Sequence, residues 1–265
     1  MQEHGLIEKD INIYYRIEGE GDPVILLHGF GEDGGIWDGM TEALSSSCKL
    51  IVPDLPGSGN SLMDTDGITI ETMAESINRI AEKEDLRDFY LVGHSMGGYI
   101  SLAFAEKFGD KLRGLGLFHS TAYADNAEKK QVREKNMEFI RKHGTLKFLE
   151  QSVPNLFSEN TRNSRPELVQ NTIDRYSNFS PTSLVNYTNA MKNRPDRTEV
   201  LRKFSKPVLF IFGEYDTAVP LEQGLEQCNI PEFSYIYIAA HSGHMGMLEE
   251  PEFCLKALQD FLSAK

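Results

Sequence analysis

The sequence predicts an α/β fold with a mostly parallel central sheet, helices on both of its faces, and a helical segment inserted before the last strands. Short apolar runs alternate with amphipathic stretches through residues 1–120, and the same rhythm returns in residues 206–265. Such alternation is typical of parallel strands that are buried under helices. Residues 121–205 carry helical patterns without a strand-like run. With 265 residues, 40% of them hydrophobic, the chain can bury a sizeable core.

The strands and helices of the first block follow from the hydrophobic pattern. Residues 11–17 alternate apolar and polar side chains with a period of two, which predicts an antiparallel strand with one exposed face. Continuous apolar runs are expected to form buried parallel strands at residues 24–27, 50–52, 89–92 and 115–118. Amphipathic patterns predict helices at residues 70–81 and 99–108.

The inserted segment and the second block are predicted in the same way. Within residues 121–205 one helix is expected around residues 132–140 and another through 168–176. A third opens at Ser180-Pro181, where an N-cap residue precedes proline at the first helical position. At 85 residues the segment is too long for a simple loop. Beyond it we expect strands at 207–212 and 233–238 and a final helix at 251–262.

Charge is distributed unevenly along the chain. The 27 Lys and Arg residues against 40 Asp and Glu give a net charge of −13, yet residues 121–205 hold 15 basic and 10 acidic side chains, a net of +5. The remaining residues therefore carry −18, and this change of sign indicates a compositional boundary. A chain this acidic is a poor general binder of nucleic acid or anionic membranes, because phosphate groups attract clustered positive charge.

The cysteines and the N-terminal residues predict a cytoplasmic location. Cys48, Cys228 and Cys254 are odd in number and lack CxxC spacing, which suits a reducing compartment. The first residues have neither a basic nor an apolar signal region, and no apolar run approaches the roughly 18 residues that a membrane span needs. We therefore expect neither a membrane nor a nucleic-acid partner, and the sequence does not predict an oligomeric state.

A candidate nucleophile lies in the pattern G-x-S-x-G. The segment Gly93-His94-Ser95-Met96-Gly97 directly follows the strand predicted at 89–92 and directly precedes a predicted helix. A serine on such a tight strand-to-helix turn is held above the sheet edge, and the small flanking glycines permit the close turn. Ser95 is therefore the expected nucleophile.

A serine hydroxyl needs a base, and the base needs an orienting carboxylate. His244 lies in a loop between the last predicted strand and the final helix, and Asp216 directly follows the strand at 207–212. Both positions are at carboxyl ends of strands, where open α/β sheets place their sites. We expect His244 to be the base and Asp216 the acid, with His241 and Glu214 as the competing candidates.

The oxyanion of a tetrahedral intermediate needs preorganised donors. One candidate is the backbone N–H of Met96, immediately after Ser95. The other is the N–H of Phe30, in the glycine-rich loop that follows the strand at 24–27.

Five motifs resemble those of the α/β-hydrolase superfamily, and the resemblance extends over nearly the whole chain. In the family's order they are His28-Gly29-Phe30-Gly31 with Trp37 beyond it, Asp54-Leu55-Pro56-Gly57-Ser58-Gly59-Asn60-Ser61, Gly93-His94-Ser95-Met96-Gly97-Gly98, Gly213-Glu214-Tyr215-Asp216, and Gly243-His244 followed by Glu249 and Pro251. The order of nucleophile, acid and histidine is that of the superfamily as well. The resemblance implies an α/β-hydrolase core of residues 1–120 and 206–265, with residues 121–205 as a helical cap, or lid, over the pocket.

Three histidines are expected around the pocket in supporting roles. His119 ends the strand at 115–118, where it either lines the pocket near Ser95 or bonds to neighbouring backbone. His28 and His94 are expected to support the oxyanion loop and the serine turn. No group of His, Cys and Asp has metal-ligand spacing, so no metal is expected. The basic excess of the lid is interpreted as a solvated surface, with attraction of an anionic substrate as the alternative.

Within the superfamily, the expected serine nucleophile excludes some classes of enzyme. A serine nucleophile differs from the aspartate of haloalkane dehalogenases and epoxide hydrolases. We expect hydrolysis of a small-molecule ester or lactone through an acyl-enzyme, with no cofactor. One alternative is a carbon–carbon bond hydrolase of the same fold. The other is a non-catalytic small-molecule receptor or regulatory protein that reuses the hydrolase pocket, since fold alone does not determine function.

Overall fold

The computed structural model describes residues 2–8, 11–62 and 64–263, which form an eight-stranded sheet in the order β1-β2-β4-β3-β5-β6-β7-β8. The pairings of β1 with β2 and of β2 with β4 are antiparallel, and the others are parallel. The mostly parallel α/β fold is thereby confirmed, as is the antiparallel strand expected at 11–17. The strands are β1 (Gln2–Glu8), β2 (Ile11–Glu18), β3 (Asp22–Leu27), β4 (Cys48–Pro53), β5 (Phe89–His94), β6 (Leu112–Phe118), β7 (Val208–Gly213) and β8 (Ser234–Ala239).

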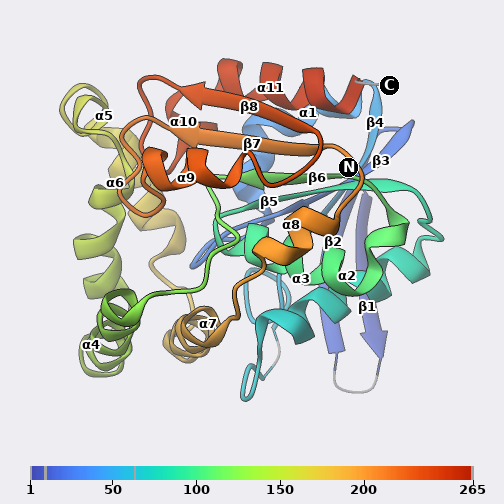
Figure 1. The fold of residues 1–265 in the computed structure, drawn as a ribbon. Coiled ribbons are helices and arrows are strands. Elements are labelled where there is room, and N and C mark those ends of the chain that lie inside the picture. The colour runs from blue at the N-terminus through green and yellow to red at the C-terminus, as the bar shows by residue number, and fades with distance from the viewer. Residues whose placement is uncertain (1, 9–10, 63, 264–265) are drawn as a thin grey trace.

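Helices cover both faces of this sheet, with α1 and α11 on one face and α2, α3 and α8 on the other (Figure 1). Alternate residues of β3 show why both faces are covered. Ile25 and Leu27 belong to the core under α2 and α3, whereas Val24 and Leu26 belong to the opposite core, and all four are fully buried. The helices outside the insertion are α1 (Asp38–Ser45), α2 (Ile70–Lys83), α3 (Met96–Phe108), α9 (Leu221–Gln227), α10 (Gly246–Glu249) and α11 (Pro251–Ser263).

Between β6 and β7 the chain forms helices and no strand, as the sequence predicts. Helices α4 to α7 lie together beyond one end of the sheet, on the left of Figure 1. Gly144, at φ 79°, interrupts α4. Ser180 caps α7 as expected, because its hydroxyl accepts the N–H of Ser183 at 3.2 Å. The inserted helices are α4 (Ala127–Ser152), α5 (Glu159–Ser164), α6 (Pro166–Tyr176), α7 (Pro181–Asn193) and α8 (Thr198–Lys203).

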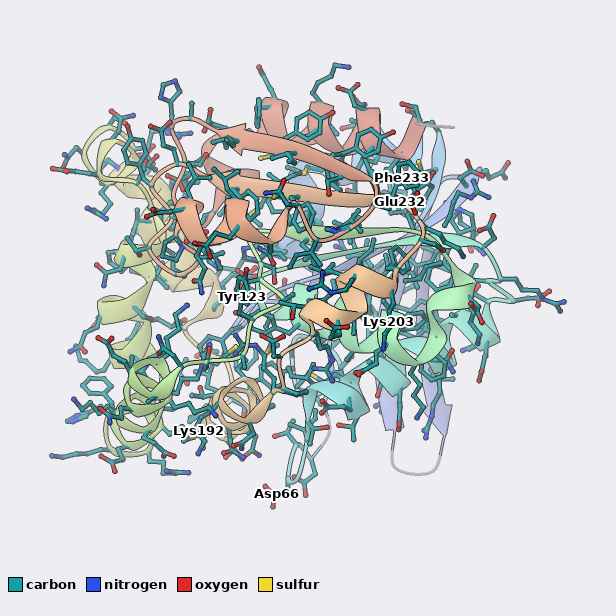
Figure 2. All side chains as sticks on the ribbon, viewed as in Figure 1. Asp66, Tyr123, Lys192, Lys203, Glu232 and Phe233 are labelled. Carbon is teal, nitrogen blue, oxygen red and sulfur yellow. The ribbon has the colours of Figure 1, made fainter. Side chains whose placement is uncertain are left out.

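The two connections of the insertion are tied to each other. Figure 2 shows Tyr123 on the outgoing connection, between β6 and α4. Its carbonyl accepts a hydrogen bond of 2.9 Å from Nη2 of Arg194, at the end of α7. Arg194 is 5% exposed and Tyr123 is partly exposed, so this link is partly buried.

Some elements were not predicted from the sequence. Strand β1 was missed because it is mostly polar and lacks the apolar pattern of a buried strand. It lies at the edge of the sheet, where it pairs with β2. Helix α3 begins at Met96, three residues before the start expected at residue 99. The short helices α1, α5, α8, α9 and α10 were also missed, because they offer too few turns for a periodic pattern. Among the described residues, no helix is long and apolar enough to cross a membrane.

Candidate active site

The turn between β5 and α3 holds Ser95 in a strained backbone conformation, with φ 49° and ψ −113°. Its N–H donates to the carbonyl of Phe118 at 2.9 Å, which fixes the turn against β6. The flanking glycines are required by close packing: a Cβ on Gly93 would lie 2.2 Å from the backbone carbon of Gly97, and one on Gly97 would lie 2.7 Å from backbone oxygens of the β3 end. Strain of this kind occurs at functional turns.

Ser95, His244 and Asp216 form a continuous chain of hydrogen bonds. Nε2 of His244 lies 2.8 Å from Oγ of Ser95, and Nδ1 lies 2.7 Å from Oδ2 of Asp216. The other carboxylate oxygen, Oδ1, accepts the N–H groups of Ala218 at 2.8 Å and Val219 at 2.9 Å. Asp216 therefore accepts the Nδ1 proton of His244, which leaves the lone pair of Nε2 facing the serine hydroxyl.

His119 lies behind this chain and does not line the pocket. Its Nε2 accepts the N–H of Gly246 at 3.2 Å, so the proton of the neutral ring is on Nδ1, 3.3 Å from Oδ2 of Asp216. Burial lowers the pKa of His119 to about 4, so it is neutral at pH 7. Its backbone has φ 48°, a second strained residue beside the site. Of the two alternatives expected for His119, the structure has the bond to backbone, at Gly246, and the side chain does not line the cavity.

Neighbouring charges shift the pKa values of Asp216 and His244 in opposite directions. Burial alone would raise the pKa of Asp216, but its contacts with His244 and His119 hold it well below its usual range. Burial alone would lower the pKa of His244, but Asp216 and the nearby Glu32 raise it above its ordinary value. The arrangement thus favours an ionised acid beside a histidine that can accept a proton.

His119, Asp216 and His244 are also the described side chains whose potential metal-ligand atoms lie within 4.8 Å of one another. The hydrogen bond from His244 to Oδ2 of Asp216, and the 3.3 Å contact of His119 Nδ1 with the same oxygen, account for this proximity.

The loop after β3, which contains Phe30, leaves the sheet beside the turn that holds Ser95. Leu27 at the end of β3 pairs with Gly93 of β5, so the two loops leave neighbouring strands at the same level. Phe30 and Ser95 both line the cavity described below, and Met96 is the first residue of α3. The assignment of the N–H groups of Phe30 and Met96 to an oxyanion remains a prediction.

A buried carboxylate that the sequence did not reveal connects these parts. Glu32 accepts the N–H of Gly29 at 2.7 Å and lies 3.0 Å from Nδ1 of His94. Nε2 of His94 in turn lies 3.1 Å from the carbonyl oxygen of His244. One acidic side chain thereby joins the oxyanion loop, the serine turn and the histidine loop. No sequence spacing relates these three segments, so only the fold identifies Glu32.

His28 supports the oxyanion loop from below and is not part of the pocket wall. The ring is fully buried, its Nε2 accepts the N–H of Leu55 at 2.9 Å, and Nδ1 donates to the carbonyl of Gly29. Asp54, expected to hold the neighbouring glycine-rich loop, accepts the N–H groups of Gly34 and Asn60. Of the three histidines expected around the pocket, His94 alone lines it.

A cavity of about 300 Å³ opens onto Ser95 and His244. Its wall is formed mainly by apolar and aromatic side chains from the oxyanion loop, from α3 and from inserted helices, among them Phe30, Tyr99, Phe148, Leu149 and Met191. The competing candidates lie outside it: Glu214 and His241 are exposed and do not line the cavity. An apolar cavity with convergent polar groups is the usual form of a small-molecule site.

Comparison with known proteins places the chain in a family. Residues 22–251 match the model of the α/β hydrolase fold family. A thermophilic esterase from Thermogutta terrifontis, solved with malate bound, shares 30% identity and a TM-score of 0.93, over 99% of this chain and 98% of its own. The enol-lactonase from Burkholderia xenovorans has the same fold, with 20% identity and a TM-score of 0.91 over 98% and 100% of the two chains.

A curated relative has a different named activity. A 2-hydroxy-6-oxononadienedioate/2-hydroxy-6-oxononatrienedioate hydrolase of Pseudomonas putida is 24% identical over 96% of this chain and 93% of its own. Relatives in this set therefore include an esterase, a lactonase and a dienedioate hydrolase. The chain belongs to the α/β hydrolase fold family and is a hydrolase of that fold.

Proposed function

We propose that the protein is a serine hydrolase that cleaves a carboxylic ester or lactone of a small organic molecule through an acyl-enzyme. The observation that carries this proposal is the hydrogen-bonded chain from Ser95 through His244 to Asp216, directed into an apolar cavity. The similarity to an esterase at 30% identity over almost the full length supports ester chemistry.

The first half of the reaction forms the acyl-enzyme. Oγ of Ser95 adds to the acyl carbon while Nε2 of His244 takes the hydroxyl proton, and Asp216 holds the imidazolium that results. The carbonyl oxygen gains the negative charge and accepts hydrogen bonds from the N–H groups of Phe30 and Met96. The intermediate collapses as the bond to the alcohol oxygen breaks, and the proton on His244 goes to the departing alcohol.

The second half returns the free enzyme. A water molecule gives a proton to His244 and adds to the acyl carbon, and the Ser95–acyl bond then breaks as the proton returns to Oγ. Neither half needs a cofactor. We further propose that residues 121–205 act as a lid domain over the core of residues 1–120 and 206–265, because residues of α4, α6 and α7 line the cavity.

The test is hydrolysis of a series of p-nitrophenyl and aliphatic esters and lactones, together with labelling by a fluorophosphonate. Wild-type turnover should fall by about 10⁴-fold or more in Ser95→Ala. Mass spectrometry should locate the phosphonyl group on Ser95. His241→Ala serves as the matched control for His244→Ala, and it should retain wild-type activity because His241 is exposed and outside the cavity. A folded protein that neither turns over any ester or lactone nor reacts with the fluorophosphonate would contradict the proposal and favour a receptor.

A carbon–carbon bond hydrolase is the second candidate, and the relative from Pseudomonas putida is the observation that favours it. A dienol dioate substrate compared with esters under the same conditions separates the two reactions. A much larger kcat/KM for the dienol than for the esters would show that the protein is a carbon–carbon bond hydrolase and not an ester hydrolase.

A further inference from the structure

Helix α4 presents three hydrogen-bond donors along one wall of the cavity. Lys129, Arg133 and Asn136 line it together with Val132. Their spacing of four and three residues puts them on a single face of the helix. More than half of the other lining residues are apolar, so the strip gathers three polar side chains on one helix of the wall.

Lys129 brings a positive charge that has no acidic partner among the residues that the structure describes. Its Nζ donates to the carbonyl of Ala218 at 3.0 Å. Within residues 2–8, 11–62 and 64–263, no carboxylate lies within 4.0 Å of it. The N–H of Ala218 donates to Oδ1 of Asp216, so the ammonium rests on the loop that carries the triad acid. Two of its three N–H groups are left for a ligand.

Arg133 adds a second cation that is only partly compensated. Its Nε pairs with Asp125, but the same carboxylate also pairs with Nη1 of Arg194 at 2.8 Å. Asp125 is fully buried between them, and one negative charge therefore faces two guanidinium groups. The terminal Nη groups of Arg133 have no hydrogen-bond partner in the part of the chain that the structure describes. A guanidinium in this state is suited to a carboxylate, which its parallel N–H groups can bind bidentately.

The cavity wall also contains one acidic side chain. Glu32 lines the cavity and is held by the N–H of Gly29 and by Nδ1 of His94. An anion is repelled there and attracted to α4, which orients a substrate that carries one charge. Its reacting carbonyl is placed at Ser95, and its charged end at Lys129 and Arg133.

We propose that the substrate carries a carboxylate at the end remote from the bond that is cleaved, and that Lys129, Arg133 and Asn136 bind this group. The inference rests on the proposed function, because it specifies the substrate class of the same site. It also assigns a role to positive charge of the lid, which the sequence alone left between a solvated surface and an attraction for anions.

The experiment compares charged substrates with neutral substrates of the same shape. Monoethyl adipate is paired with ethyl 6-oxoheptanoate, in which a methyl group replaces one carboxylate oxygen. 4-Butyryloxybutanoate is paired with 4-oxopentyl butyrate in the same way. The first pair places the charge on the acyl side and the second on the alcohol side. Hydrolysis is followed in a pH-stat at pH 8, and the readout is the ratio of kcat/KM for charged over neutral substrate.

The wild type should favour the charged member of at least one pair by about 10-fold or more, as expected for charge-assisted hydrogen bonds. Lys129→Gln and Arg133→Gln should each lower this ratio about 10-fold, and raised salt should lower it in the wild type. Lys135→Gln is the matched control, since Lys135 is an exposed lysine of α4 that does not line the cavity, and it should leave the ratio unchanged. A wild-type ratio near one in both pairs, or equal loss in Lys135→Gln, would overturn the inference.

Failure of this inference can be told from failure of the proposed function. A protein that hydrolyses neutral esters with no preference for charge keeps the proposed function and loses the carboxylate site. If no ester is turned over, binding still decides: calorimetry with Ser95→Ala should show tighter binding of monoethyl adipate than of ethyl 6-oxoheptanoate. That difference should disappear when Lys129→Gln is added. Equal binding of the two compounds would refute the carboxylate site whatever the reaction.

Discussion

Asp216→Asn tests the role of the triad acid with a change of one atom. In the wild type, Oδ1 accepts two backbone N–H groups, while Oδ2 faces Nδ1 of His244 and Nδ1 of His119. The amide of the variant has one oxygen, which can accept hydrogen bonds either from the two backbone N–H groups or from Nδ1 of His244, but not from both. If it stays on the backbone side, the NH₂ group faces His244 and forces the ring proton onto Nε2, which removes the base from Ser95.

The magnitude follows from the cost of the opposite orientation. Turning the amide so that its oxygen faces His244 leaves the N–H groups of Ala218 and Val219 buried without an acceptor, at about 1–3 kcal/mol each. The productive orientation is thus disfavoured by about 2–6 kcal/mol, or roughly 30- to 10⁴-fold. Loss of the negative charge beside the imidazolium adds to this. We expect kcat/KM for an ester to fall by on the order of 10⁴-fold.

The assay is steady-state hydrolysis of p-nitrophenyl butyrate, with the thermal unfolding midpoint measured on the same samples to verify that the variant is folded. Glu214→Gln is the matched control, because Glu214 is an exposed acid two residues earlier and the other candidate of the same motif. It should leave kcat/KM within about twofold. A fall of less than tenfold in folded Asp216→Asn, or a comparable fall in Glu214→Gln, would refute the reasoning.

Three further predictions concern the groups around the triad. Catalysis requires neutral His244, and Asp216 raises the pKa of this histidine against the effect of burial. We therefore expect kcat/KM to fall as the pH drops, with a midpoint above 6.5. A pH–rate profile with its midpoint below 6.5 would contradict this. Glu32→Ala leaves the buried N–H of Gly29 and Nδ1 of His94 without a partner, and it should lower the free energy of unfolding by about 2–6 kcal/mol in urea denaturation. Glu32→Gln keeps an acceptor and should lower the free energy of unfolding clearly less. Equal losses in the two variants would exclude the hydrogen-bonding role. Burial lowers the pKa of His119 to about 4, so as the pH falls this imidazole is protonated in the unfolded chain before it is protonated in the folded protein. The free energy of unfolding should therefore rise by about 3 kcal/mol between pH 4 and 6.5 because of this residue. His119→Asn should lose that part of the pH dependence of unfolding, and an unchanged slope would show that the ring is not held neutral.

Some of the fold could be read from the sequence because local patterns report burial. The run at 24–27 and the run at 89–92 are apolar on both sides, and β3 and β5 are buried on both faces. Strand β1 is the counterexample. It is polar and has a single neighbour, so its existence depends on pairing with β2 rather than on its own side chains.

His119 shows how a predicted strand can place a residue without giving its role. The sequence puts it at the end of a strand near Ser95, which is where it lies. Its backbone conformation, φ 48°, and the N–H of Gly246 turn the ring away from the cavity and toward Asp216. Those contacts come from residues about 100 and 127 positions away, and no local pattern reports them.

By itself the sequence determined the α/β class, the helical insertion, and the identity of a serine, an acid and a histidine at strand ends, because strand periodicity and tight glycine turns are local properties of the chain. Only the tertiary structure decided that Glu32 joins three loops, that His28 and His119 lie outside the pocket, and that Lys129 and Arg133 line it. The physical reason is that hydrogen bonding and charge compensation depend on distances between atoms, and those distances are set by packing between segments far apart in the chain.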